Sequence, residues 1–388
     1  MCAGSMDSRT RLASRSGRLW GALTTQAAPR KKVIARASMI TAAISFLQES
    51  WAWAAPVAVV GAVIAIFSRA EAAMSILLLR PPPADAFAGK VVWVTGASQG
   101  LGRALAIALH ARGAFVILTA RNKDTLEEMA RELGGADRVH VLPLDVTGPP
   151  EILQEAVSKA NNAFPERRLE IVVHAAGASQ RSRAEDTSQE VLSKIISLNG
   201  IAPIALSQAV VGQMLAAGGG QLVLLSSMAA LVPSPGQALY SAAKAAASAY
   251  HHTLMCEVCA RGVEVTVLYP GPVESADPAA ARTVFGASGL EATRDGKSSG
   301  RLSQERAVEL MTTAIYHKVS HAWIARHPVL LMAYLNQYVP WLATRILKLI
   351  GPGRARALGS HSSGAKSTDA YSLSALIRNR NTKPEGKS

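Results

Sequence analysis

The chain has 388 residues, of which 49% are hydrophobic and 18% charged, and its formal net charge is +14. This length accommodates one large α/β domain with appendages, and the composition supports both a sizeable core and membrane-directed segments. Because the positive charge gathers near the two ends and the middle has no basic stripe interleaved with aromatic residues, we exclude nucleic acid as a partner.

The N-terminal segment, residues 1–38, is rich in Arg, Ser and Ala and contains one acidic residue, Asp7. This composition is typical of a cleaved transit peptide that directs a chain to a plastid or mitochondrion. The positive flank of a retained signal anchor has the same composition, so both interpretations stay open.

Residues 39–80 are predicted to anchor the chain in a membrane. Trp51–Phe67 is an uncharged apolar run that begins with two tryptophans suited to the headgroup region, and Ala72–Leu79 continues it after a short polar interruption. No polar face repeats at helical spacing in Trp51–Phe67, which favours an anchor over the alternative, an amphipathic or buried helix. If the basic N-terminus is retained, the positive-inside rule places everything after Arg80 on the far side of the membrane.

A globular domain, expected over residues 88–327, opens with a strand, a glycine turn and a helix. Val91–Val94 is a short apolar strand and Arg103–Arg112 has helical character. The glycines between them follow a G-x-x-x-G-x-G pattern rather than the commoner G-x-G-x-x-G. Such glycines let the backbone approach a pyrophosphate, while the helix N-terminus offers unpaired N–H groups. The residues predicted to bind a dinucleotide here are Gly96, Ser98, Gln99, Gly100, Leu101 and Gly102.

The second strand, Phe115–Ala120, ends where dinucleotide-binding proteins often place a carboxylate on the ribose of NAD. Here Arg121 occupies that region, nineteen residues after Gly102, with no carboxylate beside it. A guanidinium suits a 2′-phosphate, so we expect NADP(H) as the cofactor. The alternative is a solvated basic start of the next helix.

Strand and helix patterns then alternate through the domain. Helices are predicted at Thr125–Leu133, Glu151–Phe164, Gln189–Leu215 and around Tyr240, and strands at Val139–Leu144, Ile171–His174, Leu222–Leu225 and Val263–Leu268. This order predicts an α/β fold with a doubly wound parallel sheet, a Rossmann fold, in a single catalytic domain behind the membrane segment. Ligands of such sheets bind at the carboxyl ends of the strands. The residues at those ends are Gly96, Asp145, Gly177, Ser227, Pro270 and Gly271.

The segment Ser226–Lys244 carries candidate catalytic groups. Tyr240 and Lys244 are four residues apart in an Ala-rich run, so on a helix they project from one face, where an ammonium can lower the pKa of a phenol. Ser227 follows an apolar strand that ends at the edge of the predicted sheet. A tyrosine followed four residues later by a lysine is by itself a pattern that arises by chance.

Further along the same helix, Cys256 and Cys259 have the spacing of a zinc or redox pair, with His251 and His252 upstream. A structural zinc site needs four ligands in a loop-rich knuckle, whereas this pair lies in an apolar helical pattern. Three cysteines in all, including Cys2, are too few for a disulfide framework. We therefore expect no metal site.

Taken together, these features resemble the short-chain dehydrogenase/reductase family over roughly residues 88–275. The residues that carry the resemblance are Thr95–Gly102, Asp145, His174–Gly177, Asn199, Ser227, Tyr240, Lys244 and Pro270–Ser275. Gly177–Ser182, Pro270–Ser275 and Trp323–Trp341 are more narrowly similar to a membrane-attached, microsomal branch of that family. The chain departs from the family at His174, where Asn is usual, and at Ser275, where Thr is frequent; we expect His174 to be a structural residue at a strand end.

The resemblance implies a catalytic tetrad of Asn199, Ser227, Tyr240 and Lys244. Tyr240 would protonate the carbonyl oxygen in reduction, and Lys244 would lower the pKa of that phenol and hold the nicotinamide ribose. Ser227 would hydrogen-bond the substrate oxygen, and Asn199 would position a backbone or water link to Lys244. The implied cofactor contacts beyond the glycine turn and Arg121 are Asp145, Val146, Ala176, Gly177, Asn199, Tyr240, Lys244, Pro270, Gly271, Val273 and Ser275.

The C-terminal third is less regular. Ala276–Arg301 has Gly and Ser clusters and is expected to be a mobile loop over the substrate mouth, with functionless disorder as the alternative. A helix is predicted at Arg306–His317 and a last strand at Ala322–Ala325.

Residues 328–350 combine apolar and aromatic side chains with Arg345 and Lys348. They predict a helix on a membrane surface or at the substrate mouth, and a homodimer interface is the alternative. A basic, disordered tail is expected over residues 351–388.

These features lead to one principal hypothesis, a membrane-attached NADPH-dependent carbonyl reductase or alcohol dehydrogenase. Its substrate would be a lipophilic ketone or aldehyde such as a retinoid, steroid or keto-lipid, and its location the endoplasmic reticulum. The alternatives are a 3-ketosphinganine reductase and a catalytically idle dinucleotide-binding scaffold at a membrane.

Overall fold

A computed structural model describes residues 34, 38–42, 45, 56–61, 65, 67–135, 137–274, 282–293 and 301–359. They belong to two compact units, Met1–Ser68 and Arg69–Ser388. The described residues of the first unit are helical. Of the predicted leader only residues 34 and 38 are described, and of the apolar run Trp51–Phe67 only residues 56–61, 65 and 67, so those two interpretations stay predictions.

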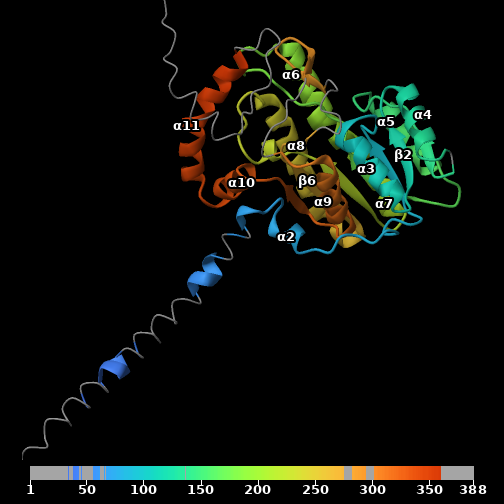
Figure 1. Ribbon diagram of the computed structural model, residues 1–388. Coiled ribbons are helices and arrows are strands. Elements are labelled where there is room, and N and C mark those ends of the chain that lie inside the picture. Colours follow the sequence, from blue (N-terminus) through green and yellow to red (C-terminus); the bar gives the residue numbers. More distant parts are fainter. Residues whose placement is uncertain are drawn as a thin grey trace, which may run out of the picture. The chain divides into compact units, whose positions relative to one another are not determined.

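The second unit is organised around a sheet flanked by helices (Figure 1). Its seven described strands are parallel and have the order β3-β2-β1-β4-β5-β6-β9. The strands are β1 Val91–Thr95, β2 Phe115–Thr119, β3 Val139–Val141, β4 Leu169–His174, β5 Gly220–Leu225, β6 Val263–Pro270 and β9 His321–Ile324. The strand order reverses between β1 and β4, which opens a crevice at their carboxyl ends. The predicted doubly wound α/β fold is confirmed.

Helices cover both faces of this sheet, because the strands are buried on both sides and their apolar side chains alternate between two cores. Trp93 contributes to one core and its neighbours Val92 and Val94 to the other. The helices of the Trp93 side are α5 Pro150–Asn161, α7 Ala202–Ala216 and α8 Ala238–Val258. Those of the opposite side are α3 Gly100–Ala111, α4 Lys123–Glu132 and α9 Gln304–Tyr316.

The helix predicted at Gln189–Leu215 has an interruption. It consists of α6 Gln189–Ile196, a π-helical turn at Ser197–Ile201 and α7. Within the described part of the chain, Gln189–Ala216 is also the one helix that is long and apolar enough to cross a membrane by length and composition. Half of its apolar window is buried, and Leu206 and Val210 pack into the core, so this helix belongs to the domain.

The predicted anchor is too long at its C-terminal end. Around α2 Met74–Leu77, the side chains of Ala72 and Ile76 are buried in the core of the second unit, and the Ala73 amide donates to the Trp323 carbonyl at 2.9 Å. Glu71 forms ion pairs with Arg306 and Arg326. These apolar residues therefore pack against protein, and the charged interruption before them is bonded to the domain.

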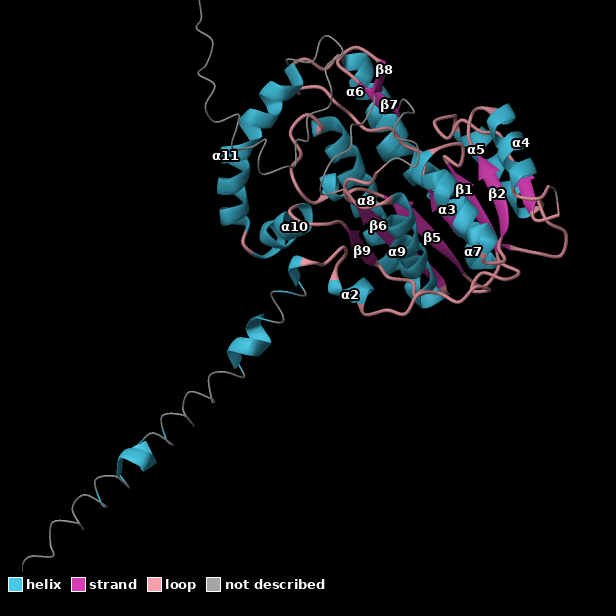
Figure 2. Cartoon of the chain, in the orientation of Figure 1, coloured by secondary structure: helices cyan, strands magenta, loops and turns pink. Residues whose placement is uncertain are grey.

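The prediction of an irregular segment at Ala276–Arg301 is wrong for residues 282–293, which form an antiparallel hairpin of β7 Arg282–Phe285 and β8 Leu290–Thr293. Gly286 and Gly289, between the two strands, suit the turn of such a hairpin. Figure 2 shows it beside α6, where the Ser188 amide donates to the Ala287 carbonyl. The flanking residues 275–281 and 294–300 lie outside the described part.

The predicted helix at 328–350 is two helices, α10 Val329–Tyr338 and α11 Pro340–Gly359. The break falls at Val339, because a proline disfavours helical backbone in the residue before it and lacks an N–H of its own. Since α11 continues to Gly359, the tail predicted to be disordered begins as helix. Asn336 donates to the Leu231 carbonyl at 2.9 Å, which joins α10 to the loop after β5.

Candidate active site

The glycine turn between β1 and α3 has the shape of an anion cradle. Gly96 has φ +68°, and a Cβ there would lie 2.7 Å from the Ala176 backbone; a Cβ on Gly102 would collide with the Gly96 carbonyl. Gln99 precedes α3 in extended backbone and its side chain caps none of the helix amides. A side chain at either glycine would fill this space, and the amides that open α3 suit a pyrophosphate. The other residues predicted to bind the dinucleotide here lie next to it: Ser98 is in the turn, and Gly100 and Leu101 are the first residues of α3.

Arg121 and Asp145 lie beyond the carboxyl ends of β2 and β3, and both are exposed. Burial opposes ionisation of Asp145, but hydrogen bonds from Thr147 and the positive charge of Arg121 lower the pKa of this carboxyl. Asp145 is therefore ionised at neutral pH and Arg121 is close enough to influence it. Val146, next in the chain, is buried in the core.

Asn199 lies in the π-helical turn, fully buried, and is bonded to the segment after β4. Its Nδ2 donates to the carbonyls of Ala178 at 3.1 Å and Ile195 at 3.2 Å, and its Oδ1 accepts from the Ala178 amide at 3.3 Å. A Cβ on Gly177 would lie 2.7 Å from Asn199 Oδ1 and 3.4 Å from Lys244 Nζ. The structure thus brings Asn199, Gly177 and Lys244 together.

Ser227 and Tyr240 approach the same edge from β5 and α8. Ser227 follows the end of β5 and accepts a hydrogen bond from the Ala229 amide at 3.1 Å. Tyr240 is half-buried in the first turn of α8, and Lys244 Nζ lies 6.0 Å from the centre of its ring. The i, i+4 spacing on α8 therefore places the lysine charge beside the phenol, as expected.

Lys244 is 4% exposed, and its ammonium donates to the Leu225 carbonyl at 2.8 Å. Burial disfavours the charged form and lowers the pKa of Lys244 from 10.5 to about 8. The side chain is still protonated at neutral pH, yet its proton is far easier to remove than that of a surface lysine.

A buried bridge of two imidazoles and a hydroxyl lies behind Lys244. Ser207 Oγ is 2.8 Å from His174 Nε2 and 2.9 Å from His251 Nε2, and His251 Nδ1 is 2.8 Å from the Ala247 carbonyl. A carbonyl only accepts, so His251 donates through Nδ1, its Nε2 accepts from Ser207, and His174 Nε2 donates to Ser207. Burial lowers the pKa of both imidazoles, that of His251 to about 4, so both are neutral.

This bridge was missed from the sequence, although His174 does lie at the end of β4 as predicted. One signal was present: His251 follows Lys244 by two helical turns and therefore shares its buried face. The position of Ser207, on a different helix, has no local pattern that indicates it.

The end of β6 supplies the remaining predicted cofactor residues. Pro270 ends the strand, Gly271 donates to the Ile324 carbonyl at 2.8 Å, and Val273 is buried. A Cβ on Gly271 would lie 2.7 Å from that of Ala325, so the backbones of β6 and β9 approach closely here. Ser275 lies outside the described residues.

His252, Cys256 and Cys259 take no part in the contacts described at the site. Cys256 and Cys259 are exposed, and His252 Nε2 is 2.8 Å from the Tyr269 hydroxyl. Across the described ranges, no group of three or more His, Cys, Asp or Glu side chains could hold a metal ion.

The chain is similar to known proteins over the domain that contains this site. The family model described as short chain dehydrogenase matches residues 90–283. The chain is 32% identical over 293 residues to human dehydrogenase/reductase SDR family member 7, covering 72% of this chain and 82% of that protein. It is 30% identical over 266 residues to bovine dehydrogenase/reductase SDR family member 7B, covering 66% and 80%.

Among solved structures, a short-chain dehydrogenase from Streptomyces avermitilis is similar with a TM-score of 0.54 and 24% identity. The similarity covers 69% of this chain and 99% of that one, and it supports the fold. Both relatives carry the designation of family member 7, the branch that Gly177–Ser182, Pro270–Ser275 and Trp323–Trp341 resemble, and their names say nothing about a membrane.

Proposed function

The chain belongs to the short-chain dehydrogenase family, and from that premise we propose that it is a membrane-attached, NADPH-dependent reductase of a lipophilic ketone or aldehyde. Members of this family are oxidoreductases that act on alcohol and carbonyl groups with a nicotinamide dinucleotide. The observation that carries the proposal is the gathering of Asn199, Ser227, Tyr240 and Lys244 beside the glycine cradle, at the carboxyl ends of β4 and β5.

Tyr240 is the proton donor in this proposal. An unperturbed phenol has a pKa near 10, so it needs a positive neighbour to exchange a proton at neutral pH. Lys244 supplies that charge, and its bond to the Leu225 carbonyl fixes the ammonium on the Tyr240 side of α8. A nicotinamide, when bound, supplies the hydride; the chain supplies placement, charge and the proton.

Ser227 and Asn199 hold the reacting groups in place. The Ser227 hydroxyl, which now accepts from the Ala229 amide, keeps its proton available to donate to a substrate oxygen as negative charge develops there. Asn199 holds the Ala178 backbone with both ends of its carboxamide and so fixes the strand-end segment next to Lys244.

The preference for NADP(H) over NAD(H) rests on Arg121. Its guanidinium follows β2 where the adenosine ribose is held in dinucleotide-binding sheets, and it is exposed there. A 2′-phosphate would accept charge-assisted hydrogen bonds from it. Asp145 lies farther along the sheet edge, after β3, and is already bonded by Thr147.

Two sets of exposed apolar residues support attachment to a membrane, which we place in the endoplasmic reticulum. In the first unit, Val57, Val59 and Val60 are 68%, 62% and 57% exposed on helical backbone. In the second unit, Tyr338 and Trp341 are 74% and 61% exposed next to the break between α10 and α11. Lipid is the environment in which such side chains are stable when exposed, and it also delivers a retinoid, steroid or keto-lipid.

The test is NADPH oxidation by the full chain in detergent against a panel of retinoid, steroid and keto-lipid carbonyls. We expect turnover of at least one class, loss of about a thousandfold or more in kcat for Tyr240→Phe, and normal rates for Tyr316→Phe, which changes an exposed tyrosine on α9. Turnover of 3-ketosphinganine alone assigns that substrate instead. NADPH binding without turnover of any carbonyl identifies an idle scaffold, and Tyr240→Phe with full activity refutes the mechanism.

A further inference from the structure

The catalytic helix α8 has no cap of its own at its N-terminus. Gln237 occupies the N-cap position, and its side chain accepts no hydrogen bond from the helix amides. The carboxamide oxygen of Gln180, far away in the chain, takes that place: Oε1 accepts from the Leu239 amide at 3.0 Å and from the Tyr240 amide at 3.2 Å. The backbone of the predicted proton donor is thus held by a residue outside its helix.

The orientation of this carboxamide follows from its neighbours. Gln180 is 0% exposed, and its Nε2 donates to Ser182 Oγ at 2.9 Å and Thr187 Oγ1 at 3.2 Å. A reversed amide would place its NH₂ against the two helix N–H groups, so only the observed orientation pairs every group. Gln180 is therefore fully bonded on both sides.

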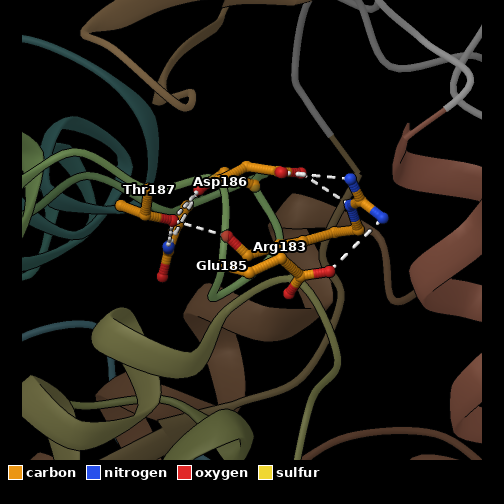
Figure 3. Close-up of polar contacts among 6 residues, drawn as sticks. Arg183, Glu185, Asp186 and Thr187 are labelled. Atoms are coloured by element: carbon orange, nitrogen blue, oxygen red, sulfur yellow. Dashed lines mark hydrogen bonds and ion pairs between the residues drawn. The ribbon is translucent and has the colours of Figure 1, made fainter.

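Side chains of the loop that carries Gln180 bond to one another and to the loop backbone. Thr187 Oγ1 donates to the Arg183 carbonyl at 2.7 Å, and the Arg183 guanidinium bonds Asp186 at 2.6 Å and Glu185 at 3.3 Å (Figure 3). Figure 3 shows the arginine between the two carboxylates, with Thr187 on the opposite side of the loop. These contacts join residues within the loop between β4 and α6 that carries Gln180.

The same loop also holds the elements that border the predicted substrate side. Phe285 of the hairpin donates its amide to the Ser179 carbonyl at 2.8 Å and accepts from the Arg181 amide at 2.8 Å. Its ring is 4% exposed and packs with Ala243 of α8 in a cluster against which Tyr240 is partly buried. Gln237 Nε2 donates to Ser179 Oγ at 2.7 Å.

We propose that Gln180 is a positioning residue for Tyr240, which fixes the first turn of α8 and thereby the phenol relative to Ser227 and Lys244. This inference rests on the proposed function, in which Tyr240 donates the proton. Lys244 lies one turn farther into the helix and has its own bond to Leu225, so Gln180 controls Tyr240 rather than the lysine. Its loss should impair the chemical step and leave cofactor binding intact, because a displacement of about 1 Å can cost ~100-fold in rate.

The test compares three variants of the full chain in detergent. Gln180→Met removes the cap and keeps the length of the side chain, whereas Gln180→Glu keeps an oxygen for both amides. Gln221→Met is the matched control, since Gln221 is also a buried glutamine, bonded to Thr266 and the Ile315 carbonyl away from the site. The readouts are kcat, the Kd for NADPH, the isotope effect with deuterated NADPH, and hydrogen exchange of the Leu239 and Tyr240 amides.

For Gln180→Met we expect kcat to fall about 10- to 100-fold, with Kd for NADPH within about twofold and a larger isotope effect. The two amides should exchange about tenfold faster, as loss of a helix cap predicts. Gln180→Glu should retain more of the wild-type kcat than Gln180→Met, because its carboxylate still accepts from both amides at the helix N-terminus, although it loses the donor to Ser182 and Thr187. If methionine prevents folding, Gln180→Asn, one methylene shorter, replaces it with the same expectations.

Equal losses of kcat in Gln180→Met and Gln221→Met would overturn the inference, since they would show a general loss of stability. Faster exchange at Tyr240 with unchanged kcat would overturn it as well, and would leave the proposed function standing. A wild-type protein that reduces no carbonyl overturns the proposed function instead, whatever the exchange rates show.

Discussion

Burial of the Lys244 ammonium should lower the free energy of unfolding of this protein. Its pKa is lowered from 10.5 to about 8 because burial disfavours the ammonium. Between these two values the unfolded chain binds a proton that the folded chain has lost, so stability rises with pH across this window. Below pH 8 the folded state carries the whole cost, about 3 kcal/mol at 1.36 kcal/mol per pKa unit.

Lys244→Met keeps the linear stem and removes the charge. It also leaves the Leu225 carbonyl without the donor it has at 2.8 Å, which costs about 1–3 kcal/mol at every pH. The change of the stability difference with pH is therefore a better test than its value at one pH. The variant's stability relative to the wild type should fall by about 2 kcal/mol from pH 7 to pH 9.5. In the same buffers, wild-type kcat/KM should decline above about pH 8, as Lys244 loses its charge.

The assay is denaturant unfolding of the cofactor-free protein in mild detergent, followed by tryptophan fluorescence, at pH 7, 8, 9 and 9.5. Differences between variant and wild type cancel the titration of groups that both share. Lys159→Met, at an exposed position on α5, controls for the loss of a lysine as such. A stability difference for Lys244→Met that stays constant with pH would refute the reasoning, because Lys244 would then titrate alike in the folded and unfolded chains.

Three further predictions concern other parts of the site. Arg121→Ala should raise the KM for NADPH about tenfold by removing a charge-assisted contact, and leave the KM for NADH within about twofold; equal effects on both cofactors would contradict the assignment of Arg121. Gly177→Ala places a Cβ 2.7 Å from Asn199 Oδ1, so kcat should fall about tenfold or more. Gly212→Ala, at an exposed position of α7, should leave kcat unchanged. Ser207→Ala leaves two buried imidazole nitrogens unpaired, so the free energy of unfolding in denaturant titrations should fall by about 2–4 kcal/mol. Ser193→Ala, at an exposed position on α6, is the control, and an equal loss in that variant would contradict the prediction.

The fold could be predicted from the sequence because its signals are local. Strands such as Val91–Thr95 are continuous apolar runs, and the glycines after them mark the turn into α3. Tyr240 and Lys244 were found for the same reason, since a spacing of four on a helix fixes a shared face. The end of the predicted anchor was wrong, because an apolar run such as Ala72–Leu79 has the same composition whether it meets lipid or a protein core.

The supporting residues of the site could not be predicted, because their partners lie far away in the chain. Gln180 reaches Tyr240 across 60 residues, and Ser207 reaches His174 across 33 and His251 across 44. Each is a common polar residue with no distinguishing local spacing. Only the folded arrangement shows that such a side chain is buried and that its partner is a catalytic helix.

Polar contacts of this kind set the rotation of α8 about its own axis. Its first half is rich in alanine, and small side chains interdigitate little with a sheet, so apolar packing alone defines the rotation of this helix weakly. Gln180 bonds the backbone amides of the first turn of the helix, and directional side-chain bonds are made along its buried face, at Lys244 by the Leu225 carbonyl, at Ser248 by Ser226 and at His251 by Ser207. Rotating the helix by one residue, about 100°, would break these three side-chain bonds together and leave buried polar groups unpaired, each at about 1–3 kcal/mol. The polar contacts thus supply the orientation that larger apolar side chains would otherwise give.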